Sequence, residues 1–245
     1  MVQSHSLIGP ARDQAARGDV AVHDHLCGIY ETTERQYEPA CRFMRAGLER
    51  GEQCLYIAER MSPAEFARRL EAHGVDVARA SKGGSLVIAS GAEVRSALGG
   101  FTPARMLGYL AERATSARAA GFTALRLGAD MTWLRQPDIA PVDLFSYEAE
   151  LNLLLQSHEV VALCQYSREH FESEGLVAMA ETHPLLVYDD LVCDNFYYVP
   201  PEEYRKPRFS DQRLQRMLFN IISRERMMHD TVATDLPPIN VAAVP

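Results

Sequence analysis

Histidine, cysteine and tyrosine side chains lie close together near the start of the chain, in the stretch His23-Asp24-His25-Leu26-Cys27-Gly28-Ile29-Tyr30. Imidazole and thiolate are ligands for transition metals, and a thiol beside an imidazole can act as a nucleophile beside a base. One residue separates His25 from Cys27, so on a strand both side chains point to the same face. The two residues therefore form half of a metal site or part of a pocket wall, and His23 is a weaker candidate at the strand margin.

A strand, a loop and an amphipathic helix must position these side chains. Tyr37, Met44 and Leu48 recur at helical spacing after the stretch, and Gly51 supplies a helix end. Open α/β sheets bind ligands where a strand runs into such a loop. A nucleotide-binding protein would place glycines, a lysine and a hydroxyl residue there, but the chain contains no Gly-x-x-x-x-Gly-Lys-Ser/Thr sequence. We expect this junction to hold something other than a triphosphate.

Short apolar runs alternate with helical patterns along the rest of the chain. Strands are predicted at 53–58, 85–89, 123–128 and 159–166, with further strands or a terminal hairpin at 185–188 and 195–199. Helices are predicted to begin near Ser62, Thr102, Asp138 and Ser173. This alternation predicts an α/β fold with a mostly parallel sheet and right-handed crossovers.

Composition and length limit the classes of protein. The 245 residues carry 33 acidic and 25 basic side chains, a net charge of −8, which does not favour nucleic acid or an anionic membrane as a partner. No apolar run is long enough to span a bilayer. Five cysteines without a Cys-x-x-Cys pair suit a reducing compartment, and no secretion signal is evident, so we expect a cytoplasmic protein.

The chain divides into four predicted parts. Residues 1–19 form a loose arm, 20–204 a folded domain, 210–230 a separate helix and 231–245 a disordered tail. Leu214, Met217, Ile221 and Met228 give that helix an apolar stripe. A lone helix of this length is not stable in water, so it must pack on the domain or on a second copy of the chain.

Several other side chains have both a structural and a functional interpretation. Asp130 follows a predicted strand at the edge where α/β sheets bind ligands, and it can equally cap the next turn. Trp133 can line a pocket or lie in the core. The tyrosines Tyr30, Tyr56 and Tyr166, at or near strand ends, can form a partly polar aromatic wall, although such residues are more often core.

Two charged residues lie within apolar segments and need partners. Arg126 is in the middle of an apolar strand and Glu148 is on a mostly apolar helix, so we expect the two to pair with each other. A metal site at His25 and Cys27 needs further ligands. His183, Cys164 and Cys193 are candidates if the fold brings them close.

The motifs together resemble the MEDS domain, a sensory domain of methanogen, methylotroph and DcmR-type regulators. The resemblance covers roughly residues 20 to 204. It rests on the order and spacing of His25-Leu-Cys27 with Tyr30-Glu31, Gly51-Glu52-Gln-Cys-Leu-Tyr56-Ile, Gly121-Phe122-x-Ala-Leu-Arg126, Met131-Thr-Trp133, Tyr147-Glu148-x-x-Leu-Asn152, Ala162-Leu-Cys-Gln-Tyr166, Thr182-His183-Pro184 and Asn195-x-Tyr197-Tyr-Val-Pro200-Pro. It implies a three-layer RecA-like sandwich, related to the core of KaiC-type proteins but without the phosphate loop, that senses small hydrocarbon derivatives.

The residues and the resemblance together predict a non-catalytic sensory domain. We expect it to bind a small, mainly apolar molecule at the carboxyl edge of the sheet, without a cofactor, and to signal through helix 210–230 as a homodimer to a regulatory protein partner. The expected ligand-binding residues are His25, Cys27, Tyr30, Tyr56, Arg126, Asp130, Trp133, Glu148, Tyr166 and His183. Two alternatives remain open: a metal or redox sensor with a transition metal on His25, Cys27 and His183, and a degenerate nucleotide-binding enzyme. Direct binding of nucleic acid or a membrane is not expected.

Overall fold

The computed structural model describes residues 20–188, 191–204, 215, 218–219 and 222. The predicted arm at 1–19, most of the predicted helix at 210–230 and the predicted tail at 231–245 lie outside the described residues. No helix in the described part of the chain is both long and apolar enough to cross a bilayer.

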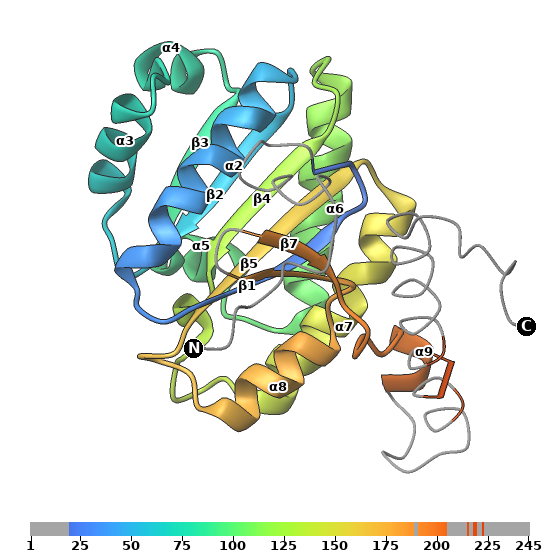
Figure 1. The fold of residues 1–245 in the computed structure, drawn as a ribbon. Helices are drawn as coiled ribbons and strands as arrows, with labels where there is room; N and C mark the ends of the chain where they lie inside the picture. The colour runs from blue at the N-terminus through green and yellow to red at the C-terminus, as the bar shows by residue number, and fades with distance from the viewer. Residues whose placement is uncertain (1–19, 189–190, 205–214, 216–217, 220–221, 223–245) are drawn as a thin grey trace, which may run out of the picture.

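A seven-stranded sheet in the order β3-β2-β4-β5-β1-β6-β7 forms the middle layer (Figure 1). All neighbouring strands pair in parallel except β6 and β7, which pair antiparallel. The mostly parallel sheet is therefore confirmed. The strands are β1 (His25–Tyr30), β2 (Gln53–Ala58), β3 (Leu86–Ser90), β4 (Leu125–Asp130), β5 (Val160–Ser167), β6 (Leu185–Tyr188) and β7 (Leu191–Asp194).

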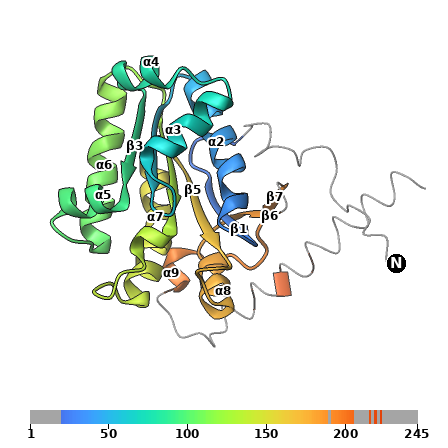
Figure 2. The ribbon, with the colours of Figure 1, turned by 90° about the vertical axis from the view of Figure 1, so that its left-hand side faces the viewer.

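Helices cover both faces of the sheet, as Figure 2 shows for α2 and α6 on opposite sides. One apolar core lies under α2 (Tyr37–Glu49) and α3 (Pro63–Ala72). The other lies under α5 (Gly91–Leu98), α6 (Pro103–Ala119), α7 (Pro141–Ser157) and α8 (Ser173–Glu181). The remaining elements are the 3-10 turns η2 (Glu34–Gln36) and η3 (Met131–Leu134), and the short helices α4 (Val77–Lys82) and α9 (Pro201–Tyr204). The three-layer sandwich expected from the sequence is confirmed.

Strand alternation decides which layer each side chain enters. Leu26 packs in the core under α2, whereas Cys27 packs in the core under α7. In β4, Leu127 likewise belongs to the α7 side. Successive strand residues point to opposite faces, so His25 faces α7 and Arg126 faces α2.

Three local features differ from the expected pattern. The helices α4 and α5 were not predicted from the sequence, although Ser90 and Glu93 form a capping box that starts α5. The predicted strand at 195–199 is wrong, because β7 ends at Asp194 and the residues that follow it up to Val199 are not in a strand. The side-chain oxygen of Asn195 accepts a hydrogen bond from the Tyr197 backbone at 2.9 Å, which turns the chain out of the extended conformation.

Candidate functional site

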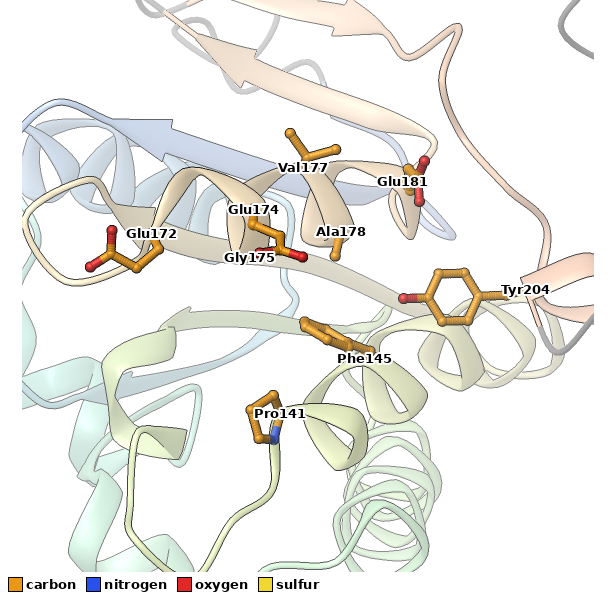
Figure 3. Close-up of a pocket in the computed structure, with 9 residues that line it drawn as sticks. All are labelled: Pro141, Phe145, Glu172, Glu174, Gly175, Val177, Ala178, Glu181 and Tyr204. Carbon is orange, nitrogen blue, oxygen red and sulfur yellow. The ribbon is translucent and has the colours of Figure 1, made fainter. Parts of the chain in front are cut away.

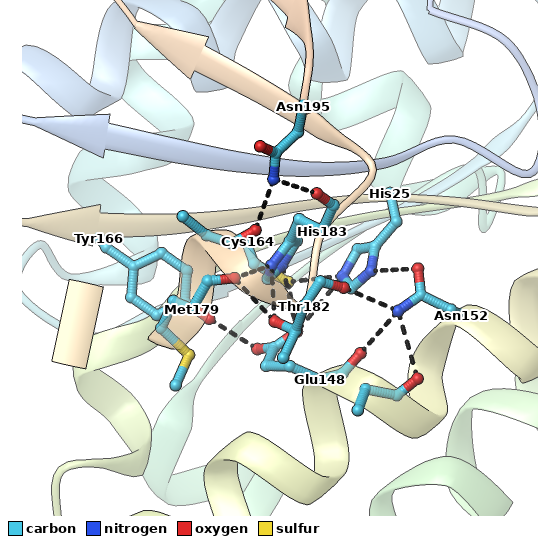
Figure 4. Close-up of polar contacts among 11 residues, drawn as sticks. His25, Glu148, Asn152, Cys164, Tyr166, Met179, Thr182, His183 and Asn195 are labelled. Atoms are coloured by element: carbon cyan, nitrogen blue, oxygen red, sulfur yellow. Dashed lines mark hydrogen bonds and ion pairs between the residues drawn. The ribbon is translucent and has the colours of Figure 1, made fainter. Parts of the chain in front are cut away.

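Four side chains that can bind a metal meet between the sheet and α7 (Figure 4). They are His25 on β1, Glu148 on α7, Cys164 on β5 and His183 just before β6, and all four are fully buried. The Nε2 atoms of His25 and His183 each lie 3.3 Å from Oε2 of Glu148. The sulfur of Cys164 lies 3.4 Å from the same carboxylate oxygen and 3.6 Å from His25 Nε2. We call these four residues the buried cluster.

Neighbouring polar groups orient three members of the buried cluster, His25, Glu148 and His183. The Asn152 side-chain oxygen lies 3.1 Å from His25 Nδ1, and the Met179 carbonyl lies 2.7 Å from His183 Nδ1. Tyr166 donates its hydroxyl hydrogen to Oε1 of Glu148 at 2.8 Å. The amide of Asn195 donates to the backbone carbonyl of His183 at 2.7 Å. The Nε2 atoms and Oε2 are therefore held toward one common point.

Burial shifts the proton equilibria of the buried cluster strongly. Loss of hydration, reinforced by the charge of His183, lowers the pKa of His25 to about 4. Burial raises the pKa of Cys164, and the Glu148 carboxylate raises it further. Burial also acts to raise the pKa of Glu148, but the influence of His183 and His25 beside its carboxylate outweighs it and holds that pKa well below its usual range.

The structure places the ten expected ligand-binding residues in separate groups. Four of them, His25, Glu148, Tyr166 and His183, belong to the buried cluster or contact it. Cys27 is buried on β1, the strand that also carries His25, and it lies opposite Cys164 of β5 in the strand register. Its sulfur is not among the four grouped ligand atoms. The metal set proposed from the sequence therefore needs Cys164 in place of Cys27, and Glu148 as a fourth member.

The expected pairing of Arg126 with Glu148 is wrong. Arg126 Nε donates to Glu52 Oε2 at 2.5 Å, and the guanidinium lies 4.3 Å from the ring centre of Phe43. Arg126 faces the α2 layer, whereas Glu148 is on α7 beyond the opposite face of the sheet. Two side chains on opposite faces of one sheet cannot meet, which the apolar pattern around each residue did not reveal.

Asp130 organises the carboxyl edge of the sheet. One oxygen accepts hydrogen bonds from the amide and hydroxyl of Thr132, at 3.1 and 2.7 Å, so Asp130 caps η3 as the structural interpretation predicted. The other oxygen accepts from Gln36 Nε2 at 3.1 Å and from the Arg60 amide at 3.0 Å. The carboxylate thus ties β4 to the start of α2 and to the loop after β2.

The same network includes a second expected residue, Tyr56. Its hydroxyl donates to the side-chain oxygen of Gln165 at 3.1 Å, and Gln165 in turn donates to the Gln36 carbonyl at 2.7 Å. Burial raises the pKa of Tyr56 well above its usual range. Tyr30 and Trp133 are also buried, and Trp133 packs edge-on against Phe101 with ring centres 5.8 Å apart. These aromatic residues are core side chains in this structure.

A mainly apolar groove lies beside the turns that follow β4 and β5. It has a volume of about 430 Å³ and lies between the start of α7 and α8; we call it the α7–α8 groove. Its apolar lining consists of Leu134, Ile139, Leu144, Phe145, Phe171 and Met179. Arg135, Gln136, His170 and Glu172 add polar groups. None of the ten expected residues lines the groove.

An outer space of about 850 Å³ continues the α7–α8 groove toward α9. Figure 3 shows Phe145 and Tyr204 between α7 and α8. Glu172, Glu174 and Glu181 also line this outer space. The acidic side chains surround an apolar interior, so the electrostatics disfavour an anionic ligand.

Two residues of the groove wall, Phe171 and Met179, also contact the buried cluster or its surroundings. The ring of Phe171, which lines the groove, meets the ring of Tyr166 edge-on with centres 5.1 Å apart. Met179 lines the groove with its side chain and accepts the His183 hydrogen bond with its carbonyl. The groove wall and the surroundings of the buried cluster are therefore in contact at two residues.

The fold and the site define a RecA-like α/β domain with no phosphate loop. In accord with this fold, the flagellar accessory protein FlaH of Methanocaldococcus jannaschii superposes with a TM-score of 0.50 at 9% identity, over 74% of this chain and 77% of that chain. The sequence model of the MEDS domain, the methanogen/methylotroph, DcmR sensory domain, matches residues 24–184. This chain belongs to the MEDS family.

A curated relative has the same domain. The transcriptional repressor DcmR of Methylorubrum extorquens is 30% identical over 179 residues, which cover 73% of this chain. The match spans 64% of the length of that repressor. The family indicates a sensory role for the chain.

Proposed function

We propose that this protein is a non-catalytic sensory domain that binds a small, uncharged and mainly apolar organic molecule in the α7–α8 groove. The observation that carries the proposal is the groove itself, an apolar cavity of about 430 Å³ in a chain of a sensory family. A cavity of this volume fits the lower part of the range for small-molecule sites. Its apolar lining supplies affinity through burial, and Gln136 and His170 supply polar anchors.

The carboxyl edge near β1 favours this role over nucleotide hydrolysis. In phosphate-binding relatives of this architecture, free backbone amides at the start of the helix hold the phosphates. Here the exposed carboxylates of Glu31 and Glu34 are paired with Arg168 at 2.8 Å and with Arg69 at 2.7 Å. The Thr33 amide already donates to Glu169 at 2.8 Å. The Thr33 amide and the two arginines are thus already engaged by carboxylates of this chain, so we infer that the domain is not an enzyme acting on nucleotides.

The signal must leave the domain through a partner. The relative DcmR is a transcriptional repressor, which supports a regulatory protein as the recipient of the signal. Leu218, Phe219 and Ile222 are exposed among the described residues after α9. We propose that this segment pairs with a second copy of the chain in the cytoplasm, and that ligand binding changes how that pair engages its regulatory partner.

The matched glycines Gly175 and Gly108 give a direct test of the ligand site. Both lie in helices, and a side chain added at either meets no atom within 4 Å, but only Gly175 lines the groove. A thermal-shift screen of small alcohols, halocarbons and methylated compounds should give saturable hits with the wild type. Gly175→Leu should weaken the best hit at least tenfold by filling the groove, whereas Gly108→Leu should not.

Two results would contradict the proposal. Hits that bind equally well to Gly175→Leu and to the wild type would place the site outside the groove. A screen without any saturable hit would exclude this ligand class.

A further inference from the structure

The centre of the buried cluster has more hydrogen-bond acceptors than donors. The Asn152 amide nitrogen faces the carbonyls of Glu148, Ala149 and Thr182, at 2.8 to 3.2 Å, so its oxygen must face His25. An amide oxygen only accepts, so Nδ1 of His25 carries the hydrogen and Nε2 presents a lone pair.

The same reasoning applies to the second histidine of the cluster. The Met179 carbonyl, 2.7 Å from His183 Nδ1, only accepts, so that nitrogen carries the hydrogen. In the neutral imidazole, Nε2 of His183 then presents a lone pair toward the Glu148 carboxylate, 3.3 Å away. Within the described residues, no hydrogen-bond partner satisfies this Nε2 atom.

Three electron pairs therefore converge on a volume that contains one available hydrogen. The thiol hydrogen of Cys164 can reach Glu148 Oε2 at 3.4 Å, and Tyr166 already occupies the other carboxylate oxygen. Facing lone pairs in a fully buried site repel one another, and burial removes them from the bulk solvent that would screen them. A cation at the centre would turn this repulsion into coordination.

We propose that His25, Glu148, Cys164 and His183 bind one divalent transition metal, best fitted by Zn²⁺. Zinc binds histidine nitrogen, carboxylate oxygen and thiolate sulfur at about 2.0 to 2.3 Å in tetrahedral geometry, which sets neighbouring ligand atoms roughly 3.3 to 3.7 Å apart. Four of the six separations are 3.3, 3.3, 3.4 and 3.6 Å. All four ligand atoms lie within 4.8 Å of one another.

Charge balance also supports a divalent ion. One carboxylate, one thiolate and two neutral imidazoles carry a total charge of −2, so Zn²⁺ makes the fully buried site neutral. Binding releases the Cys164 thiol proton to solvent, and no electron is transferred. Asn152 and the Met179 carbonyl accept hydrogen bonds from the two histidines, and Tyr166 donates to Glu148, so the ligand side chains are oriented as is usual at metal sites.

The metal would have a role distinct from that of the organic ligand. The four ligands come from β1, α7, β5 and the segment before β6, so one ion would join the sheet to the helix that borders the groove. All four side chains have no solvent exposure, so metal release requires local opening and should be slow. The site does not depend on the groove being the sensory site.

Cobalt provides the test, because its tetrahedral thiolate complexes absorb in the near ultraviolet and the visible. The full chain, purified without a metal-binding tag and freed of metal with a chelator, should bind one Co²⁺ with both absorption features, and Zn²⁺ should displace it. Cys164→Ser should remove the near-ultraviolet thiolate band. Cys27→Ser is the matched control, an equally buried thiol on the adjacent strand, and should keep the band.

Three results would overturn the proposal. These are metal content far below one equivalent after titration, a thiolate band that persists in Cys164→Ser, or a band that is lost only in Cys27→Ser. If Cys164→Ser does not fold, X-ray absorption of the zinc-loaded wild type decides. One sulfur and three nitrogen or oxygen neighbours would support the site, and a shell without sulfur would refute it.

Discussion

Arg126 and Glu52 form a buried ion pair on the α2 side of the sheet, with Nε and Oε2 2.5 Å apart. Removing one member leaves the other charge buried without its partner, which costs roughly 3 to 5 kcal/mol in comparable sites. We expect Glu52→Gln to lower the free energy of unfolding by that amount in urea titrations.

An exposed pair serves as the control for this prediction. Arg118 and Glu159 lie 3.9 Å apart with both side chains about half exposed. Glu159→Gln should change stability by less than about 1 kcal/mol, because water screens such pairs. Equal losses of unfolding free energy in the two variants would show that burial does not strengthen the contribution of the Arg126–Glu52 pair.

Asp130 should stabilise the carboxyl edge through its four hydrogen bonds. Asp130→Ala leaves the amides of Arg60 and Thr132 without their acceptor. We expect a loss of about 2 to 3 kcal/mol and faster hydrogen exchange at those two amides. Asp76→Ala, which removes the exposed cap of α4, should cost only about 1 kcal/mol. Unchanged exchange at Arg60 would contradict the bridging role.

Thiol reactivity should separate the five cysteines by burial and pKa. Burial raises the pKa of Cys41 and of Cys54 to about 12, so both thiols stay protonated between pH 7 and pH 10, and the thiolate is the reactive form. We expect Cys193, which is partly exposed, to be the one thiol that reacts readily in the native protein. Raising the pH from 7 to 10 should not make Cys41 or Cys54 reactive toward the alkylating reagent. Unfolding in urea should expose all five thiols to it. Mass spectrometry of alkylated peptides gives the answer.

Nucleotides should not bind at the β1–α2 junction. Glu31 and Glu34 are exposed there, and the amide and hydroxyl of Thr33 are both occupied by Glu169. Isothermal titration with MgATP should give no saturable heat, and incubation should release no phosphate. A stoichiometric complex would restore the nucleotide-binding alternative.

Exposed aromatic side chains allow a test of self-association in the intact chain. Phe219 is 68% exposed in the segment proposed to pair with a second copy, and Tyr197 is 74% exposed outside that segment. Light scattering should report a dimer for the wild type and for Tyr197→Glu, and a monomer for Phe219→Glu. A dimeric Phe219→Glu would remove that segment from the interface.

The sequence by itself determined the order and type of most elements. Apolar runs such as Val160–Ser167 and caps such as Ser62 act within a few residues, so their effects are visible in the chain alone. Strand alternation also places His25 and Cys27 on one face, because that relation depends only on their spacing of two residues.

Only the tertiary structure decided which distant side chains meet. The sheet order puts β5 and β6 on either side of β1, and this brings Cys164 and His183 to His25. Strand alternation and the position of α7 also put Arg126 and Glu148 on opposite faces of the sheet. The apolar pattern around each of the two residues could not reveal this separation. The groove has the same origin, because its walls come from loops and helix ends that follow two different strands. Local spacing governs secondary structure, whereas a site depends on contacts between residues far apart in the chain.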